Sequence, residues 1–114
     1  MRSLDLAWER AKILRDREKW IKRIKEAAEE VLPDIVGIYL FGSAVTGDLV
    51  ASSDIDLLIV ARNLPKSLVS KSELKGKIVE KSGLPMAHPF EIHLVDESEA
   101  EIYFRHIGGK FLKL

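Results

Sequence analysis

The chain has 114 residues, of which 46% are hydrophobic and 32% are charged, and this composition indicates a globular rather than a disordered protein. Its 18 basic and 18 acidic residues give a formal net charge of +0, so we expect no stable nucleic-acid binding. Cysteine is absent, which excludes disulfides and thiolate metal sites. The sequence shows neither a membrane-spanning apolar stretch nor a signal peptide, so we expect a single cytoplasmic domain over 1–114.

Residues 3–32 predict an N-terminal helical segment, because good helix formers dominate it and neither glycine nor proline occurs from 4 to 32. Two apolar stripes recur at helical spacing, namely Leu4, Ala7, Trp8, Ala11, Leu14 and then Trp20, Ile21, Ile24, Ala27, Ala28, Val31, Leu32. The charged stretch 15–19 between the stripes allows one continuous helix or a break, and we favour a break. If the second stripe covers a sheet, the first is left to form a homo-oligomer or partner interface.

The basic residues of this segment, Arg10 among them, are interleaved with acids. Glu18 precedes Lys22 by four residues, the spacing of a helical ion pair. This pattern favours a salt-bridged outer face over a nucleic-acid surface.

The stretch 35–60 carries most of the functional information. Two apolar runs, 35–41 and 57–60, predict buried strands. Between them stand Gly42, Ser43, ten further residues, and then Asp54, Ile55 and Asp56. Side chains on a strand alternate between its faces, so Asp54 and Asp56 are expected to project to the same side. Two carboxylates this close repel each other unless a cation lies between them, and Mg²⁺ suits such oxygen ligands.

The glycine turn before the acidic pair predicts an anion site. Gly42 lets the backbone approach a ligand closely, and the short helix expected after it would present free N–H groups to a phosphate. Ser43 adds a hydroxyl donor, and Thr46 can donate one more hydrogen bond. Ser53 caps or turns the backbone into the second strand, close to the same phosphates.

The pattern of Gly42, Ser43, ten residues, Asp54 and Asp56 resembles the signature of the DNA polymerase β-like nucleotidyltransferase superfamily, in particular its minimal members. The resemblance implies an α/β fold, a small mixed β-sheet flanked by helices, with the catalytic core over 35–107. It also implies that Ser43 holds the nucleotide triphosphate, that Asp54 and Asp56 bind two Mg²⁺ ions, and that a later strand supplies a third carboxylate.

The rest of the chain offers a candidate for that carboxylate. A helix is predicted from Pro65 to about Lys81, a strand over 90–95, and a last helix from about 96 to 107. Residues 111 and 112 either dock on the chain or pair in an oligomer. Glu91 lies in the otherwise mostly apolar strand, where a carboxylate is disfavoured unless it is paired or ligated. We interpret it as a metal ligand and general base rather than a solvent-facing residue.

His93 shares the predicted face of Glu91 and could contact a phosphate, orient Glu91 or serve as a hydrogen-bonded structural residue. Related proteins often carry an arginine in the segment after the Gly-Ser pair, and residues 44–47 contain none. Triphosphate binding would then be weaker or would rely on a distant residue such as Arg62 or Lys66. This departure leaves catalytic turnover open.

The resemblance implies transfer of AMP from ATP to a hydroxyl of a partner protein, as in the antitoxin half of a pair with a HEPN-domain toxin. The alternative is a nucleotide- and partner-binding antitoxin module with little or no catalysis. Transfer to an antibiotic is the third hypothesis, and it lacks an evident substrate-binding domain in this sequence.

Overall fold

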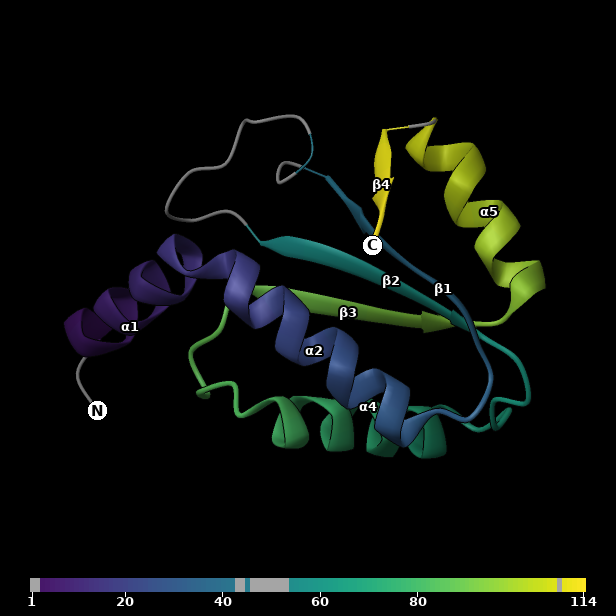
Figure 1. Cartoon of the computed structure of the whole chain (residues 1–114), viewed down its shortest axis with the longest axis horizontal. Coiled ribbons are helices and arrows are strands. Elements are labelled where there is room, and N and C mark those ends of the chain that lie inside the picture. Colours follow the sequence, from purple (N-terminus) through teal and green to yellow (C-terminus); the bar gives the residue numbers. More distant parts are fainter. Residues whose placement is uncertain (1–2, 43–44, 46–53, 109) are drawn as a thin grey trace.

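The structure, a computed structural model, describes residues 3–42, 45, 54–108 and 110–114. Its helices and strands are, in chain order, α1 (Ser3–Arg15), α2 (Arg17–Val31), β1 (Ile35–Phe41), β2 (Ile55–Ala61), α4 (Leu68–Ser82), β3 (Phe90–Val95), α5 (Glu97–Ile107) and β4 (Phe111–Lys113) (Figure 1). The strands form one mixed sheet in the order β3-β2-β1-β4. β2 pairs in parallel with β3, whereas β1 is antiparallel to both β2 and β4. The predicted α/β fold with a small mixed sheet is confirmed.

Helices cover both faces of the sheet (Figure 1). On one face, Ile55, Leu57 and Ile59 of β2 are completely buried and form one core with side chains of α2 and α4. On the other face, Leu58 and Val60 pack in a second cluster with aromatic side chains of α5. Because β2 is buried on both faces, its sequence is a continuous apolar run rather than an alternating one.

The helical segment at the N-terminus breaks at Asp16, as predicted, so that α1 ends at Arg15 and α2 begins at Arg17. Among the stripe residues of α1 whose side chains the structure describes, only the last is packed in the core. Leu14 is buried and Trp8 keeps 65% of its surface exposed. The last turn of α1 is therefore anchored in the core, while its earlier turns leave the apolar side chains at the surface.

Two helix boundaries show how local capping decides an element's limits. The predicted start of α4 at Pro65 is wrong, because the side chain of Ser67 accepts a hydrogen bond from Ser70 N and caps a helix that begins at Leu68. α5 begins after Asp96, whose side chain forms a capping box with Glu99. The segment Phe111–Lys113 pairs with β1 of its own chain, which settles the alternative left open for residues 111 and 112.

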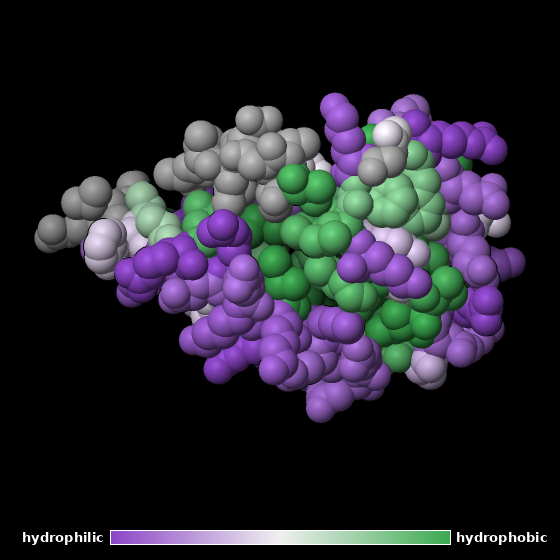
Figure 2. All heavy atoms as spheres, turned by 45° about the horizontal axis from the view of Figure 1, so that its top comes forward, coloured by the Kyte–Doolittle hydropathy of each residue, from purple (hydrophilic) through white to green (hydrophobic). Residues whose placement is uncertain are grey.

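Apolar side chains gather in the middle of the face shown in Figure 2, and hydrophilic side chains frame them. A pocket of about 510 Å³ lies between α2 and β4, with Ile21, Leu40, Leu112 and Leu114 in its lining. Among the described residues, the helices are all too short or too polar to cross a membrane.

Candidate functional site

The parallel pairing of β2 with β3 brings three polar side chains together. Asp56 is opposite Glu91 and Leu58 is opposite His93 in the register, so Asp56, Glu91 and His93 lie on the same face of the sheet. One ligand atom from each of the three lies within 4.8 Å of the others. The structure thus places Glu91 beside Asp56, as the sequence predicted, and the catalytic roles of these residues stay a proposal.

His93 links the two carboxylates to helix α5. Its Nε2 lies 3.3 Å from Asp56 Oδ1 and 3.8 Å from Glu91 Oε1, and its Nδ1 lies 3.4 Å from the Tyr103 hydroxyl. Two tautomers of His93 fit these distances. In one, the Tyr103 hydroxyl donates to Nδ1 and the Nε2–H donates to Asp56. In the other, the Nδ1–H donates to the Tyr103 hydroxyl, and the Nε2 lone pair faces the carboxylates and a cation bound between them. Either arrangement holds the ring in place, so the structure supports an orienting role for His93.

Tyr103 was not anticipated as a site residue, because the sequence analysis treated the last helix as apolar packing. The ring of Tyr103 lies 5.5 Å from that of His93, and Phe41 of β1 contacts both rings, with centroid distances of 5.4 Å to His93 and 6.4 Å to Tyr103. A tyrosine on a sheet-facing helix was the only signal in the sequence. These aromatic rings form the apolar side of the site.

Gly42, directly after β1, is in close approach to the Asp56 side chain. Its φ is +81°, in the left-handed region, and a Cβ at this position would lie 2.8 Å from Asp56 Oδ2. The sequence predicted a close backbone approach to a ligand; the structure adds an approach to the carboxylate itself. Glycine is required here because of the left-handed backbone and because a Cβ would collide with the Asp56 carboxylate.

Asp54 lies outside the three-residue cluster. It immediately precedes β2, its side chain is 58% exposed, and its Oδ1 accepts a hydrogen bond from Arg10 Nη2 at 3.0 Å. The sequence analysis assigned Arg10 to the solvated face of the N-terminal helix and so missed this contact. The two residues are 44 positions apart, and no local pattern could have indicated that they meet.

The remaining predicted residues fall into two groups. Ser43, Thr46 and Ser53 lie outside the described residues. Arg62, considered as a source of positive charge for a triphosphate, follows the opposite end of β2 from Asp56, roughly 20 Å along the strand. Its Nε donates to Glu97 Oε1 at 2.7 Å, and this ion pair lowers the pKa of Glu97. Arg62 therefore does not reach the carboxylates.

The donor set of the cluster fits a divalent cation. A six-coordinate Mg²⁺ ion with bonds of about 2.0–2.1 Å separates neighbouring ligand atoms by about 3 Å and opposite ones by about 4 Å. His93 Nε2 lies 3.3 and 3.8 Å from the two carboxylate oxygens, and the three ligand atoms all lie within 4.8 Å of one another, so small side-chain shifts would bring them to these separations. The two carboxylates suit Mg²⁺ or Mn²⁺, whereas an imidazole is a more usual ligand of other transition metals.

His88, in the loop before β3, shares the electrostatic surroundings of Arg10. Burial lowers the pKa of His88 below its usual 6.5, and the positive charge of Arg10 lowers it further. The His88 Nδ1 accepts a hydrogen bond from Phe90 N at 3.2 Å. His88 is therefore a neutral ring at the entrance of β3.

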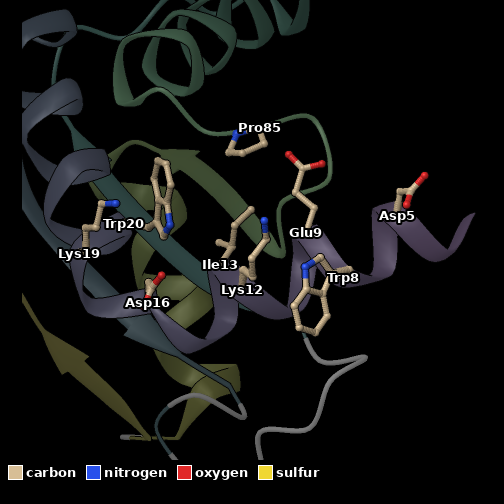
Figure 3. A pocket seen from close by; sticks show the side chains of 9 residues that line it. All are labelled: Asp5, Trp8, Glu9, Lys12, Ile13, Asp16, Lys19, Trp20 and Pro85. Carbon is tan, nitrogen blue, oxygen red and sulfur yellow. The ribbon is translucent and has the colours of Figure 1, made fainter. Parts of the chain in front are cut away.

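A separate pocket of about 440 Å³ lies between α1, the beginning of α2 and Pro85 (Figure 3). Trp8 and Trp20 line it together with acidic and basic side chains of α1 and α2. None of the cluster residues Asp56, Glu91 and His93 lines this pocket. The pocket thus belongs to the N-terminal helices rather than to the carboxylates.

Comparison with known proteins gives matches over most of the chain. The family model described as "Polymerase beta, Nucleotidyltransferase" matches residues 22–109. A Methanocaldococcus jannaschii protein whose name assigns it as a protein adenylyltransferase is 44% identical over 46 residues, covering 40% of this chain and 31% of that protein. A spectinomycin 9-adenylyltransferase of Staphylococcus aureus is 37% identical over 70 residues, covering 57% of this chain and 26% of that protein. The chain spans less than a third of the length of these curated relatives.

Solved structures extend the comparison to the fold. A crystal structure described as a nucleotidyltransferase superposes with a TM-score of 0.64 at 36% identity, covering 82% of this chain and 96% of that one. A complex of the tri-AMPylated HEPN toxin of Shewanella oneidensis with its MNT antitoxin gives a TM-score of 0.53 at 20% identity, covering 85% of this chain and 69% of that one. The second likeness is one of fold alone.

Proposed function

The chain belongs to the polymerase β nucleotidyltransferase family, and from this premise we propose that it transfers AMP from ATP to a hydroxyl of a partner protein with the help of Mg²⁺. The observation that carries the proposal is the meeting of Asp56 and Glu91 on one face of two adjacent parallel strands. The name of the M. jannaschii relative, a protein adenylyltransferase, supports the class of acceptor.

Asp54, Asp56 and Glu91 would hold two Mg²⁺ ions, which when bound supply the positive charge that stabilises the phosphates during transfer. The side chain of Glu91 is 56% exposed, so an acceptor hydroxyl can approach it. Glu91 would accept the hydroxyl proton as the oxygen bonds to the α-phosphorus and the bond to pyrophosphate breaks. Gly42, Ser43, Thr46 and Ser53 would bind the phosphates, and His93 would orient Asp56.

We take the partner to be a HEPN-domain protein, which makes this chain the antitoxin of a toxin–antitoxin pair in the cytoplasm. The support is the likeness in fold to the MNT antitoxin that was solved in complex with an AMPylated HEPN toxin. The exposed apolar part of α1 around Trp8 offers a surface for the partner or for a second copy of this chain.

The alternative function is a binding module that masks its partner without transferring a nucleotide. The observation that favours it is the ion pair between Asp54 and Arg10, in which one predicted metal ligand contacts a cation of the chain and is not part of the cluster. Residues 44–47, directly after the Gly-Ser pair, also carry no arginine.

One experiment separates the two functions. The purified protein is incubated with ATP labelled at the α-phosphate, Mg²⁺ and the protein encoded next to it, and label on each protein is measured. Transfer that is lost when Asp54→Ala and Asp56→Ala are combined supports the enzyme. A tight complex that forms without transfer, and that is indifferent to both substitutions, supports the binding module.

A matched pair of isosteric variants sharpens the result. Glu91→Gln removes one negative charge from the cluster, whereas Glu101→Gln removes the same charge from an exposed position of α5. Transfer should fall by at least about a hundredfold in the first variant and stay unchanged in the second. Equal activity of the two variants would refute the role of Glu91.

A further inference from the structure

We propose that Arg10 of the N-terminal helix α1 is a phosphate-binding residue of this site, held by Asp54 until a divalent cation takes that carboxylate. The inference rests on the proposed nucleotide transfer and names a further residue that binds the nucleotide. Its basis is the 3.0 Å contact from Arg10 Nη2 to Asp54 Oδ1.

Helix α1 lies outside the part of the chain that matches the family model, which begins at residue 22. It nevertheless delivers a guanidinium to one of the acidic residues of the family signature. The position of the helix does not depend on that ion pair, because an exposed pair contributes at most about 1 kcal/mol. Ile13 and Leu14, which are 3% and 7% exposed, anchor the helix in the core. Core packing thus carries Arg10 to Asp54.

The positive charges around β2 point to Arg10 as the phosphate-binding residue near the beginning of the strand. Arg62 is bound to Glu97 at the far end of the strand, and His88 beside Arg10 is kept neutral by burial. Among the described residues, Arg10 is the arginine whose guanidinium forms an ion pair at the beginning of β2, through Asp54. A triphosphate bound at the carboxylates would bring several negative charges to this end of β2, where Arg10 can offset them.

The chemistry of the guanidinium permits the exchange of partners. A carboxylate and a phosphate present similar pairs of oxygens to its planar N–H donors, so one can replace the other without a change in geometry. The Arg10 side chain is 26% exposed, so solvent screens its charge only in part. A divalent cation that binds Asp54 competes with Arg10 for that carboxylate, and the N–H donors that contact Asp54 can then turn to a phosphate oxygen.

This exchange predicts two opposite effects of Arg10→Ala. Without nucleotide, the variant should bind a divalent cation more tightly, because the competing guanidinium is gone. With the cation present, it should bind nucleotide more weakly, because a charged hydrogen bond to phosphate is lost. An ion pair that serves Asp54 alone would give the first effect without the second, so the loss of nucleotide affinity is the decisive one.

The test measures both affinities in Arg10→Ala and in the control Lys12→Ala. Lys12 lies on the same helix and carries the same charge, and it lines the separate pocket of α1 and α2 (Figure 3). Electron paramagnetic resonance measures the binding of Mn²⁺ alone, and calorimetry measures the binding of a non-hydrolysable ATP analogue with Mn²⁺. We expect Arg10→Ala to bind Mn²⁺ about two- to fivefold more tightly and the analogue at least about tenfold more weakly. Lys12→Ala should match the unsubstituted protein in both.

Analogue binding by Arg10→Ala within about twofold of the unsubstituted protein, or an equal loss in Lys12→Ala, would overturn the inference. Weaker binding of Mn²⁺ by Arg10→Ala would overturn it as well, since Arg10 would then hold Asp54 in place for the metal. An unsubstituted protein that binds no analogue refutes the proposed function together with the inference. One that binds the analogue and transfers AMP, with Arg10→Ala unchanged, refutes the inference alone.

Discussion

Replacing Gly42 by alanine tests whether the turn after β1 holds the Asp56 carboxylate in place. Gly42 has a φ of +81°, and an L residue in the left-handed region costs about 1–2 kcal/mol. The added methyl group would also lie 2.8 Å from Asp56 Oδ2, which is too close, so the carboxylate must move. Because that oxygen ends a short rotatable side chain, we expect its movement to add little to the loss of stability. Metal affinity should fall about 10- to 100-fold, as when a group that orients a ligand is removed.

Gly108→Ala is the matched control. Gly108 has a φ of +65°, and a methyl group added there would meet no atom within 4 Å among the described residues other than its chain neighbours. This position therefore carries the backbone cost without a contact like that at Asp56. Urea unfolding should show a similar loss of stability in both variants, and Mn²⁺ titration should show weaker binding in Gly42→Ala alone. Unchanged Mn²⁺ binding by Gly42→Ala, or an equal loss in both variants, would refute the reasoning.

Three further predictions concern stability. Gly76 lies inside α4, and a methyl group added there would meet no other described part of the chain within 4 Å, so Gly76→Ala should raise the free energy of unfolding by about 0.5–1 kcal/mol in urea; a lower value would contradict this prediction. Because the folded pKa of His88 lies below 6.5, its stabilising contribution is complete above pH 6.5 and is lost as the pH falls below it. His88→Gln should therefore flatten the dependence of the urea midpoint on pH there, and an unchanged slope would count against this assignment. Ile59→Ala, at a completely buried position of β2, should cost about 2–5 kcal/mol, and a loss under about 1 kcal/mol would show that the core collapses around the gap.

The sequence predicted the parts of the site that follow from alternation along strands. β3 is short, mostly apolar and bounded by turn residues, so its limits and the shared face of Glu91 and His93 could be predicted. The argument from alternation along a strand does not extend to Asp54. Alternation assumes that a residue is part of the strand, and β2 begins only at Ile55. Asp54 is therefore outside the pairing of β2, and its recorded contact is with Arg10.

The contacts that escaped prediction all join distant parts of the chain. The pairing of Arg10 with Asp54 depends on where the core places α1, and the contact of Tyr103 with His93 depends on how α5 packs on the sheet. The proximity of Gly42 to Asp56 follows from the antiparallel register in which Phe41 is opposite Asp56. Each needs tertiary packing, which neither periodicity nor local propensity encodes.

The binding of a divalent cation by Asp56 and Glu91 together is the central claim, and titration with Mn²⁺ tests it most directly. Mn²⁺ shares the preference of Mg²⁺ for carboxylate ligands and is detected by electron paramagnetic resonance. Asp56→Asn and Glu91→Gln should each weaken Mn²⁺ binding at least about tenfold, while Glu101→Gln binds it as the unsubstituted protein does. Retention of full affinity by either of the first two variants would contradict the account.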